Sequence, residues 1–334
     1  MGKTLINYAF HGALYIAMSF VGRQAYADSS SSEYYRQITD PSLITINQEA
    51  PRATFIPYAT DKQAILNDRS SSPYFLSLNG TWKFHYTENP EERIVRFDKV
   101  QEIASEWADI KVPGNWEVQG FGIPIYVNHP YEFVSPQKPY MQKPQPPLVP
   151  EKFNPVGTYF RTFELPESWD GRDVFISVDA AKSATYIYVN GHFAGMGKDS
   201  KTPARYKITS LLRSGKNELV IQSFRWSDAS YLECQDFWRL SGIEREVYLY
   251  TQPKTRFSDF EVIAGLDDRY ENGELVLKAD IAGNASGYSV AYRLLDASGK
   301  EVTQGVRSVQ NGSVRMDAVI PSVDKWSAEY PELY

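Results

Sequence analysis

Short segments in which apolar and polar residues alternate, each bounded by turn residues, recur along most of this chain. The dipeptide Asn190-Gly191 separates two of them and is a strong β-hairpin signal. Only residues 208–212 could form even a short helical turn, and no longer stretch has the 3.6-residue period of an amphipathic helix. Many short strands separated by turns predict an all-β sandwich or barrel. The first series of strand candidates is 78–86, 158–165, 174–178, 185–189, 193–195, 219–224 and 246–250.

The strand candidates divide the chain into two predicted β domains. Residues 71–252 have the length of a jelly-roll β-sandwich, and residues 253–334 suit an immunoglobulin-like β-sandwich. The Cys-Trp-Cys signature of immunoglobulin domains is absent, so this second prediction concerns architecture only. Residues 28–70 lack sustained periodicity and are predicted to form an extended N-terminal arm laid over the body. The second series of strand candidates is 259–263, 275–281, 289–295, 302–309 and 313–320.

Residues 1–27 have the three parts of a secretory signal peptide. Lys3 is a basic start, an apolar run covers residues 5–22, and Ala25-Tyr26-Ala27 forms a small-x-small cleavage pattern. The run is too short and too polar for a comfortable membrane span. We expect cleavage after Ala27, export to the periplasm of a Gram-negative bacterium, and no membrane association afterwards. A fusion or a wrong start site is the alternative.

Composition excludes several classes of function. The formal net charge of −6 argues against a nucleic-acid partner, because phosphate binding needs a basic surface. The single cysteine, Cys234, allows neither an intrachain disulfide nor a cysteine-based zinc site. The four histidines lie far apart without metal-ligand spacing. Aromatic residues make up 14% of the chain, which suits a β-rich core and also suits rings stacked on sugars.

Two irregular segments carry the residues of chemical interest. Residues 124–155 contain too many prolines for a helix or a central strand, so they predict a long surface loop, and such loops are usually functional. Residues 230–243, SYLECQDFWRLSGI, combine two acids, three aromatic rings and an arginine without a helix or strand period. We call these the proline-rich segment and the aromatic segment.

A sugar presents hydroxyl groups at its rim and C–H bonds on its flat faces. A sugar site therefore needs carboxylates and amides for the hydroxyls and aromatic rings for a face. The two segments contain such a set: Asn128, Glu233, Gln235, Asp236 and Trp238. Arg239 suits a structural role, pairing with an acid to hold the loop. The alternative is a wholly structural loop whose rings plug one end of the sandwich, and the three-residue spacing of Glu233 and Asp236 is weak evidence for a catalytic pair.

Several spaced motifs occur in a recognisable order between residues 78 and 334. They are VPGNW (112–116), PIYVN (124–128), NPVGTY (154–159), GKDS (197–200), RWSD (225–228) and the aromatic segment. Together they resemble the N-terminal part of a glycoside hydrolase family 2 β-galactosidase of the long, LacZ-like type. The closing residues WSAEYPELY resemble the end of that family's first immunoglobulin-like domain.

This resemblance implies a five-domain enzyme that hydrolyses terminal non-reducing β-D-galactosides with retention. A jelly-roll sugar-binding domain of the galactose-binding-like type and an immunoglobulin-like domain precede a (β/α)₈ barrel and further β domains. Both catalytic glutamates lie in the barrel, which would begin after Tyr334, so we expect this chain to contain no catalytic residue and to be inactive alone. The implied partners are a β-galactoside, the C-terminal barrel of the same protein, and further copies in a homo-oligomer.

The resemblance also implies roles for individual residues. Asn128 and Asp236 match amide and carboxylate residues that reach over the barrel mouth to bind galactosyl hydroxyls, with Trp238 and Arg239 as possible support. Asp236 further matches a ligand of a sodium ion whose other ligands come from the barrel. Asp228 matches a magnesium ligand of some members, but Lys198 stands where its partner ligand is a glutamine. A cation beside a divalent metal is repelled, which disfavours magnesium here.

Two other readings come from different functional classes. The chain could be a non-catalytic carbohydrate-binding module, which would bind galactose tightly without a barrel. It could also be a structural sandwich that serves in assembly, with the proline-rich segment bridging subunits.

Overall fold

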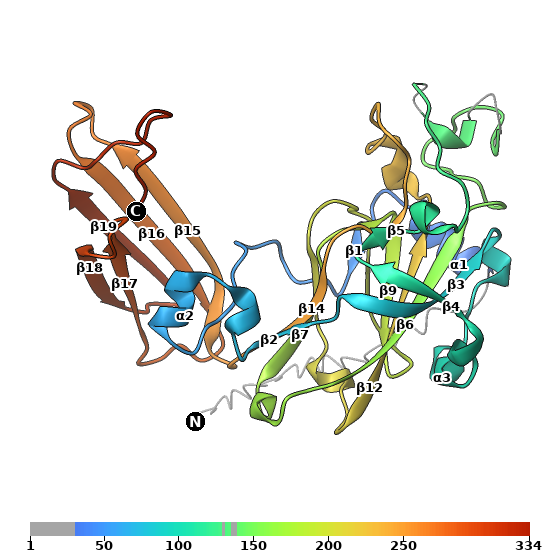
Figure 1. Cartoon of the computed structure of the whole chain (residues 1–334), viewed down its shortest axis with the longest axis horizontal. Helices are drawn as coiled ribbons and strands as arrows, with labels where there is room; N and C mark the ends of the chain where they lie inside the picture. The colour runs from blue at the N-terminus through green and yellow to red at the C-terminus, as the bar shows by residue number, and fades with distance from the viewer. Residues whose placement is uncertain (1–30, 129–130, 135–138) are drawn as a thin grey trace, which may run out of the picture.

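The computed structural model describes residues 31–334 apart from 129–130 and 135–138, so the predicted signal peptide lies outside the described residues. Figure 1 shows two β domains in this part of the chain, built from antiparallel sheets. The predicted all-β fold of two successive sandwiches is confirmed, and the described residues contain no (β/α)₈ barrel. Within the described ranges, no helix has the length and apolar character needed to cross a membrane.

Two antiparallel sheets packed face to face make the larger domain. The seven-stranded sheet has the order β1 (Thr45–Ile46), β10 (His192–Gly197), β9 (Ala184–Val189), β12 (Lys216–Phe224), β6 (Val156–Glu164), β3 (Gly80–Thr87) and β4 (Ala108–Val112). The four-stranded sheet has the order β11 (Ala204–Lys207), β7 (Asp173–Val178), β14 (Val247–Gln252) and β2 (Phe75–Ser77). A small third sheet joins β5 (Gly114–Asn115), β13 (Gly242–Ile243) and β8 (Ala181–Lys182).

The helices of the described chain are short. The α-helices are α1 (Ser31–Ile38), α2 (Asp61–Leu66) and α3 (Val100–Ile103). The 3₁₀ turns are η1 (Arg69–Ser71), η2 (Pro90–Glu92), η3 (Phe97–Lys99), η4 (Ala104–Glu106), η5 (Glu117–Gln119), η6 (Glu132–Val134), η7 (Glu167–Trp169), η8 (Thr209–Leu211) and η9 (Asp228–Tyr231).

The seven-stranded sheet is buried on both faces. Along β12, Leu219 and Ile221 point into the core shared with the four-stranded sheet, whereas Val220 and Phe224 point to a second apolar cluster on the outer face. This alternation follows from the two-residue period of a strand. Because both faces are covered, the chain that leaves β12 at residue 225 remains inside the protein.

The described part of the predicted arm, residues 31–70, is laid over the body but is not extended throughout. In α1, Tyr34 and Ile38 lie four residues apart on one helix face and are buried in the outer cluster, where the Tyr34 ring stacks on Phe224 at 5.2 Å. The arm then adds β1 to the edge of the seven-stranded sheet beside β10. The arm is helical here because a helix places Tyr34 and Ile38 on the same face, where both can pack against the sheet.

The proline-rich segment also differs in part from the predicted surface loop. Phe133 and Val149 are each only 1% exposed and pack in the outer cluster. The Phe133 ring meets the buried ring of Trp226 edge-on at 5.7 Å. Aromatic anchors therefore hold parts of this segment against the sheet, although its prolines exclude regular strands.

The predicted hairpin at Asn190-Gly191 is confirmed. Both residues have positive φ angles, 52° and 80°, as the tight turn between β9 and β10 requires. The Asn190 side chain also donates to Leu211 O and accepts from Glu218 N, so the turn is tied to its neighbours.

The smaller domain has the immunoglobulin-like architecture that the strand spacing predicts. Its three-stranded sheet is β15 (Arg256–Leu266), β16 (Gly273–Ala282) and β19 (Ser313–Ile320), and its second sheet is β17 (Ser289–Leu295) and β18 (Glu301–Ser308). Val290, Val314 and Met316 form its core. Contacts between the domains include an ion pair at 2.9 Å between Arg256 and Asp173.

Replacing Gly195 in β10 by alanine should destabilise the larger domain by about 1–3 kcal/mol. The new methyl group would lie 2.3 Å from the Tyr206 ring and 2.7 Å from the backbone oxygen of Ile46, so β1 or the ring must move. Urea unfolding measures the change. Gly265→Ala is the matched control, because its methyl group meets only open space. Equal stability of the two variants would contradict the close packing of β1 on β10.

Candidate functional site

The structure brings the proline-rich and aromatic segments together. The backbone N–H of Arg239 donates to Ile125 O at 2.7 Å, and these two residues form an isolated antiparallel bridge. Asn128 and Asp236 are both exposed and irregular in backbone conformation. The Tyr126 hydroxyl, two residues before Asn128, donates to Asp236 Oδ1 at 3.1 Å. Neither candidate side chain is therefore turned into the sandwich interior.

Aromatic rings lie beside Asp236 at the surface. The rings of Tyr126 and Trp238 are 5.5 Å apart and tilted by 52°, and these residues are 50% and 55% exposed. The hydrogen bond to Asp236 raises the pKa of Tyr126, because it favours the protonated phenol. A carboxylate next to exposed rings is the combination that a sugar face and its hydroxyl groups require.

Arg239 lies beneath this surface. The residue is 2% exposed, and its Nε and Nη1 have no hydrogen-bond partner among the described residues. It lines an enclosed space with Glu132, Lys182 and Cys234, at the lower limit of size for one water molecule. In the part of the chain that the structure describes, Arg239 forms no ion pair, so the predicted pairing with an acid is not seen, and its burial keeps it from direct contact with a bound sugar.

Glu233 and Asp236 face different surroundings. Glu233 accepts hydrogen bonds from Ser200 N at 2.9 Å and Ser200 Oγ at 2.6 Å. Burial raises the pKa of Glu233, and the two bonds from Ser200 oppose this shift. Asp236 instead bonds to Tyr126 at the surface, so the geometry offers no support for a catalytic pair within the aromatic segment.

Asp228 at the start of η9 forms a buried ion pair with Lys198. The ammonium Nζ lies 2.8 Å from Asp228 Oδ2 and also donates to the backbone oxygens of Gln37 and Asp40. Both side chains are less than 10% exposed. A covalently attached cation thus occupies the position next to the carboxylate, and these residues do not fit a divalent metal.

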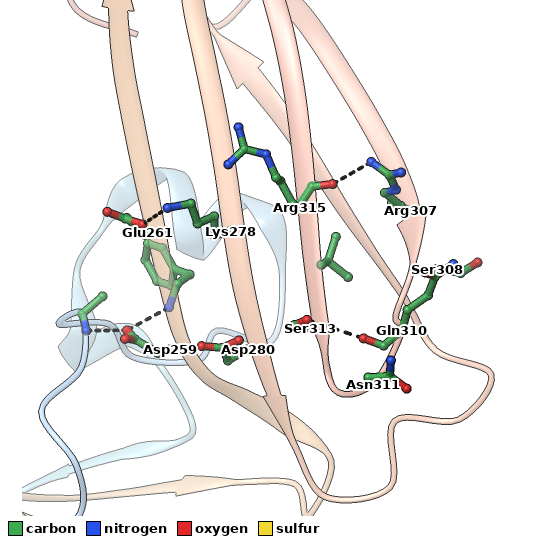
Figure 2. Close-up of a pocket in the computed structure, with 13 residues that line it drawn as sticks. Asp259, Glu261, Lys278, Asp280, Arg307, Ser308, Gln310, Asn311, Ser313 and Arg315 are labelled. Atoms are coloured by element: carbon green, nitrogen blue, oxygen red, sulfur yellow. Dashed lines mark hydrogen bonds and ion pairs between the residues drawn. The ribbon is translucent and has the colours of Figure 1, made fainter.

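Among the described residues, no three His, Cys, Asp or Glu side chains gather as metal ligands. Asp236 contributes one exposed carboxylate, and a sodium ion there would need its other ligands from outside this group. Figure 2 shows a broad groove on the immunoglobulin-like domain, where charged side chains such as Glu261 and Lys278 already pair with one another. We therefore interpret this groove as a solvent-exposed charged surface and not as a binding site.

Sequence reasoning missed Tyr126 and Arg225 as parts of this region. Tyr126 lies within the PIYVN motif, which pointed to Asn128 through its place in the series of family motifs. The contact of Tyr126 with Asp236 could not be foreseen, because it joins residues 110 positions apart. Arg225 opens the RWSD motif and is 1% exposed, and its contacts become visible only in the fold.

Replacing Lys198 by methionine should lower the free energy of unfolding by about 3–5 kcal/mol, because the Asp228 charge would remain buried without its partner. Urea unfolding of the variant and of the original chain measures the change. Lys83→Met is the matched control, since its pair with Asp109 is exposed and should contribute less than about 1 kcal/mol. A loss no larger than that of the control would contradict the assignment of a buried pair.

Comparison with known proteins gives concordant findings. Residues 75–253 match the family described as "Glycosyl hydrolases family 2, sugar binding domain". A β-galactosidase of Priestia megaterium is 38% identical over 94% of this chain, and one of Lactobacillus delbrueckii subsp. bulgaricus is 33% identical over 89%. The chain spans only 31% and 28% of the length of these two relatives.

Solved structures agree on the fold. A Bifidobacterium dentium β-glucuronidase superimposes with a TM-score of 0.58 at 17% identity, covering 77% of this chain and 43% of its own. At this identity the likeness concerns the fold alone. The family match covers more than half of the chain and includes both the proline-rich segment and the aromatic segment. This chain belongs to glycosyl hydrolase family 2 and contains the family's sugar-binding domain.

Proposed function

We propose that this chain supplies the sugar-binding and scaffold part of a retaining β-galactosidase that hydrolyses terminal non-reducing β-D-galactose residues. The observation that carries the proposal is the exposed Asp236 carboxylate, held by the Tyr126 hydroxyl beside the segment that carries Asn128. The similarity to β-galactosidases over most of the chain supports this substrate class.

In this proposal the two catalytic glutamates belong to a barrel outside these 334 residues. Asp236 and Asn128 reach towards that barrel and bind galactosyl hydroxyls, while Trp238 and Tyr126 border the sugar. Asp236 also contributes one oxygen to a sodium ion that the barrel completes. The Lys198 ammonium takes the place of magnesium at Asp228. Export to the periplasm and a homo-oligomer complete the proposal.

The Asp236→Ala variant of the complete gene product tests the role of the carboxylate. It should lower kcat/KM for an aryl β-galactoside by roughly 10²-fold or more, about 3 kcal/mol, because sugar hydroxyls lose a charged acceptor in the transition state. Asp170→Ala, a change of another exposed aspartate, is the matched control and should leave kcat/KM unchanged. Near-normal kcat/KM in the Asp236 variant would refute the role.

A carbohydrate-binding module is the second candidate, and the exposed Tyr126–Trp238 pair favours it because such rings can bind a sugar without catalysis. Calorimetry of the 334-residue chain with galactose and lactose separates the two functions. We expect weak or no binding and no turnover of an aryl β-galactoside by this chain alone. Tight binding would favour the module, and turnover above that of its Asp236→Ala variant would overturn the division of roles.

A further inference from the structure

Arg225 is the first residue after β12 and one of the most deeply buried charged residues of the larger domain. β12 lies between β9 and β6 inside the seven-stranded sheet, so its end is a fixed point of the fold. The residue is 1% exposed, and its backbone N–H is itself held by Pro155 O at 2.8 Å. A guanidinium at this place is anchored by the sheet and does not reach solvent.

The Arg225 guanidinium contacts the backbone of the aromatic segment and of the residue that directly precedes the proline-rich segment. Nη1 donates to Ile123 O at 3.2 Å, five residues before Asn128. Nη2 donates to Arg239 O at 3.1 Å, three residues after Asp236. One guanidinium group thus links the two irregular stretches of chain that carry Asn128 and Asp236. The link lies next to the bridge between Ile125 and Arg239.

Two buried carboxylates face the guanidinium at ion-pair distance. Nη2 lies 3.7 Å from Glu117 Oε1 and 3.5 Å from Glu132 Oε2. Glu117 Oε2 accepts from Ser241 N at 2.9 Å, and Glu132 Oε1 pairs with Lys182 at 3.3 Å. Glu132 follows Asn128 in the proline-rich segment, while Ser241 ends the irregular part of the aromatic segment. Both segments are therefore attached to the same ionic cluster by a second set of contacts.

We propose that Arg225 is a positioning residue that sets the placement of Asn128 relative to Asp236 and thereby the fit of the site to its sugar. The identity of the sugar rests on the proposed function. The set of contacts by which Arg225 joins the two segments, which we call the clamp, is a property of this chain. A guanidinium offers several N–H groups in a fixed fork, so Arg225 can donate to two carbonyl oxygens while its charge faces two carboxylates at 3.5 and 3.7 Å. An ammonium is a point charge on a flexible stem and cannot span them all.

Hydrogen exchange on the 334-residue chain tests the clamp directly. In Arg225→Lys, amides of residues 120–128 and 236–241 should exchange roughly tenfold faster, whereas amides of β6, β9 and β12 should keep their protection. Unchanged exchange in both segments would overturn the proposal, as would faster exchange spread evenly over the sandwich. Should Arg225→Lys fail to fold, Glu117→Gln gives the same test, because it removes one charge that orients the guanidinium and keeps the side-chain size.

Arg205→Lys is the matched control for a buried arginine. Arg205 lies in β11 of the other large sheet and is 4% exposed. Its replacement should lower the thermal stability without a selective effect on the two segments. A selective effect equal to that of Arg225→Lys would overturn the special role of Arg225.

Kinetics of the complete gene product test the link to the sugar. Arg225→Lys should lower kcat/KM for an aryl β-galactoside by roughly 10- to 10²-fold, because misplacement by about 1 Å weakens a positioned contact. In a double-mutant cycle, Asp236→Ala should then cost less in the Arg225→Lys background than alone. Additive effects would mean that Arg225 acts on folding only and would overturn the proposal. A wild-type product inactive on β-galactosides would instead refute the proposed function, and hydrogen exchange would still decide whether the clamp exists.

Discussion

Coverage of the seven-stranded sheet on both faces is the constraint on which the rest of the larger domain depends. Antiparallel sheets commonly leave one face to water. Here the four-stranded sheet covers one face, and α1 together with parts of the proline-rich segment covers the other. The chain that leaves β12 must therefore run through the interior, where Arg225 and Trp226 are buried. It reaches the surface from Leu232, which is 85% exposed, and stays exposed at Asp236 and Trp238, so the packing decides where an exposed site can form.

Buried charges give this region its specific geometry. Lys182, Lys198 and Arg225 are each at most 5% exposed and lie in ion pairs with carboxylates. Burying such groups is costly unless carboxylates or carbonyl oxygens compensate, so each pair tolerates few alternative arrangements. Glu117 illustrates the balance, since burial raises its pKa and the nearby Arg225 opposes the shift. Apolar packing could hold the same segments together, but it would not impose the directions that a guanidinium and its acceptors impose.

Much of the fold was predictable from local sequence pattern. The predicted strands 289–295 and 313–320 coincide with β17 and β19, and the Asn190-Gly191 turn lies where its dipeptide indicated. The strands β1 and β11 were not predicted, because both are short and their strand character depends on partners far away in the chain. The two helices of the arm were missed because six to eight residues give too little periodicity to recognise.

The candidate residues could be named from the sequence, but the contacts that support them could not. Carboxylate, amide and rings in irregular segments indicated a sugar site, and the motif order indicated the family. That Asp236 is exposed while Glu233 is bound by Ser200 follows from which way each side chain turns in an irregular loop, and no periodic pattern encodes this. Likewise, the role of Arg225 depends on carbonyl groups 102 and 14 residues away along the chain.

The pairing of Lys198 with Asp228 has a consequence for the surroundings in which this corner of the protein keeps its shape. A dissolved ion leaves its ligands when it is diluted or sequestered, whereas an ammonium on a side chain has a local concentration that never changes. The contacts that join the arm at Gln37 and Asp40 to η9 are built around this tethered charge. Their integrity therefore does not depend on the concentration of any dissolved metal ion.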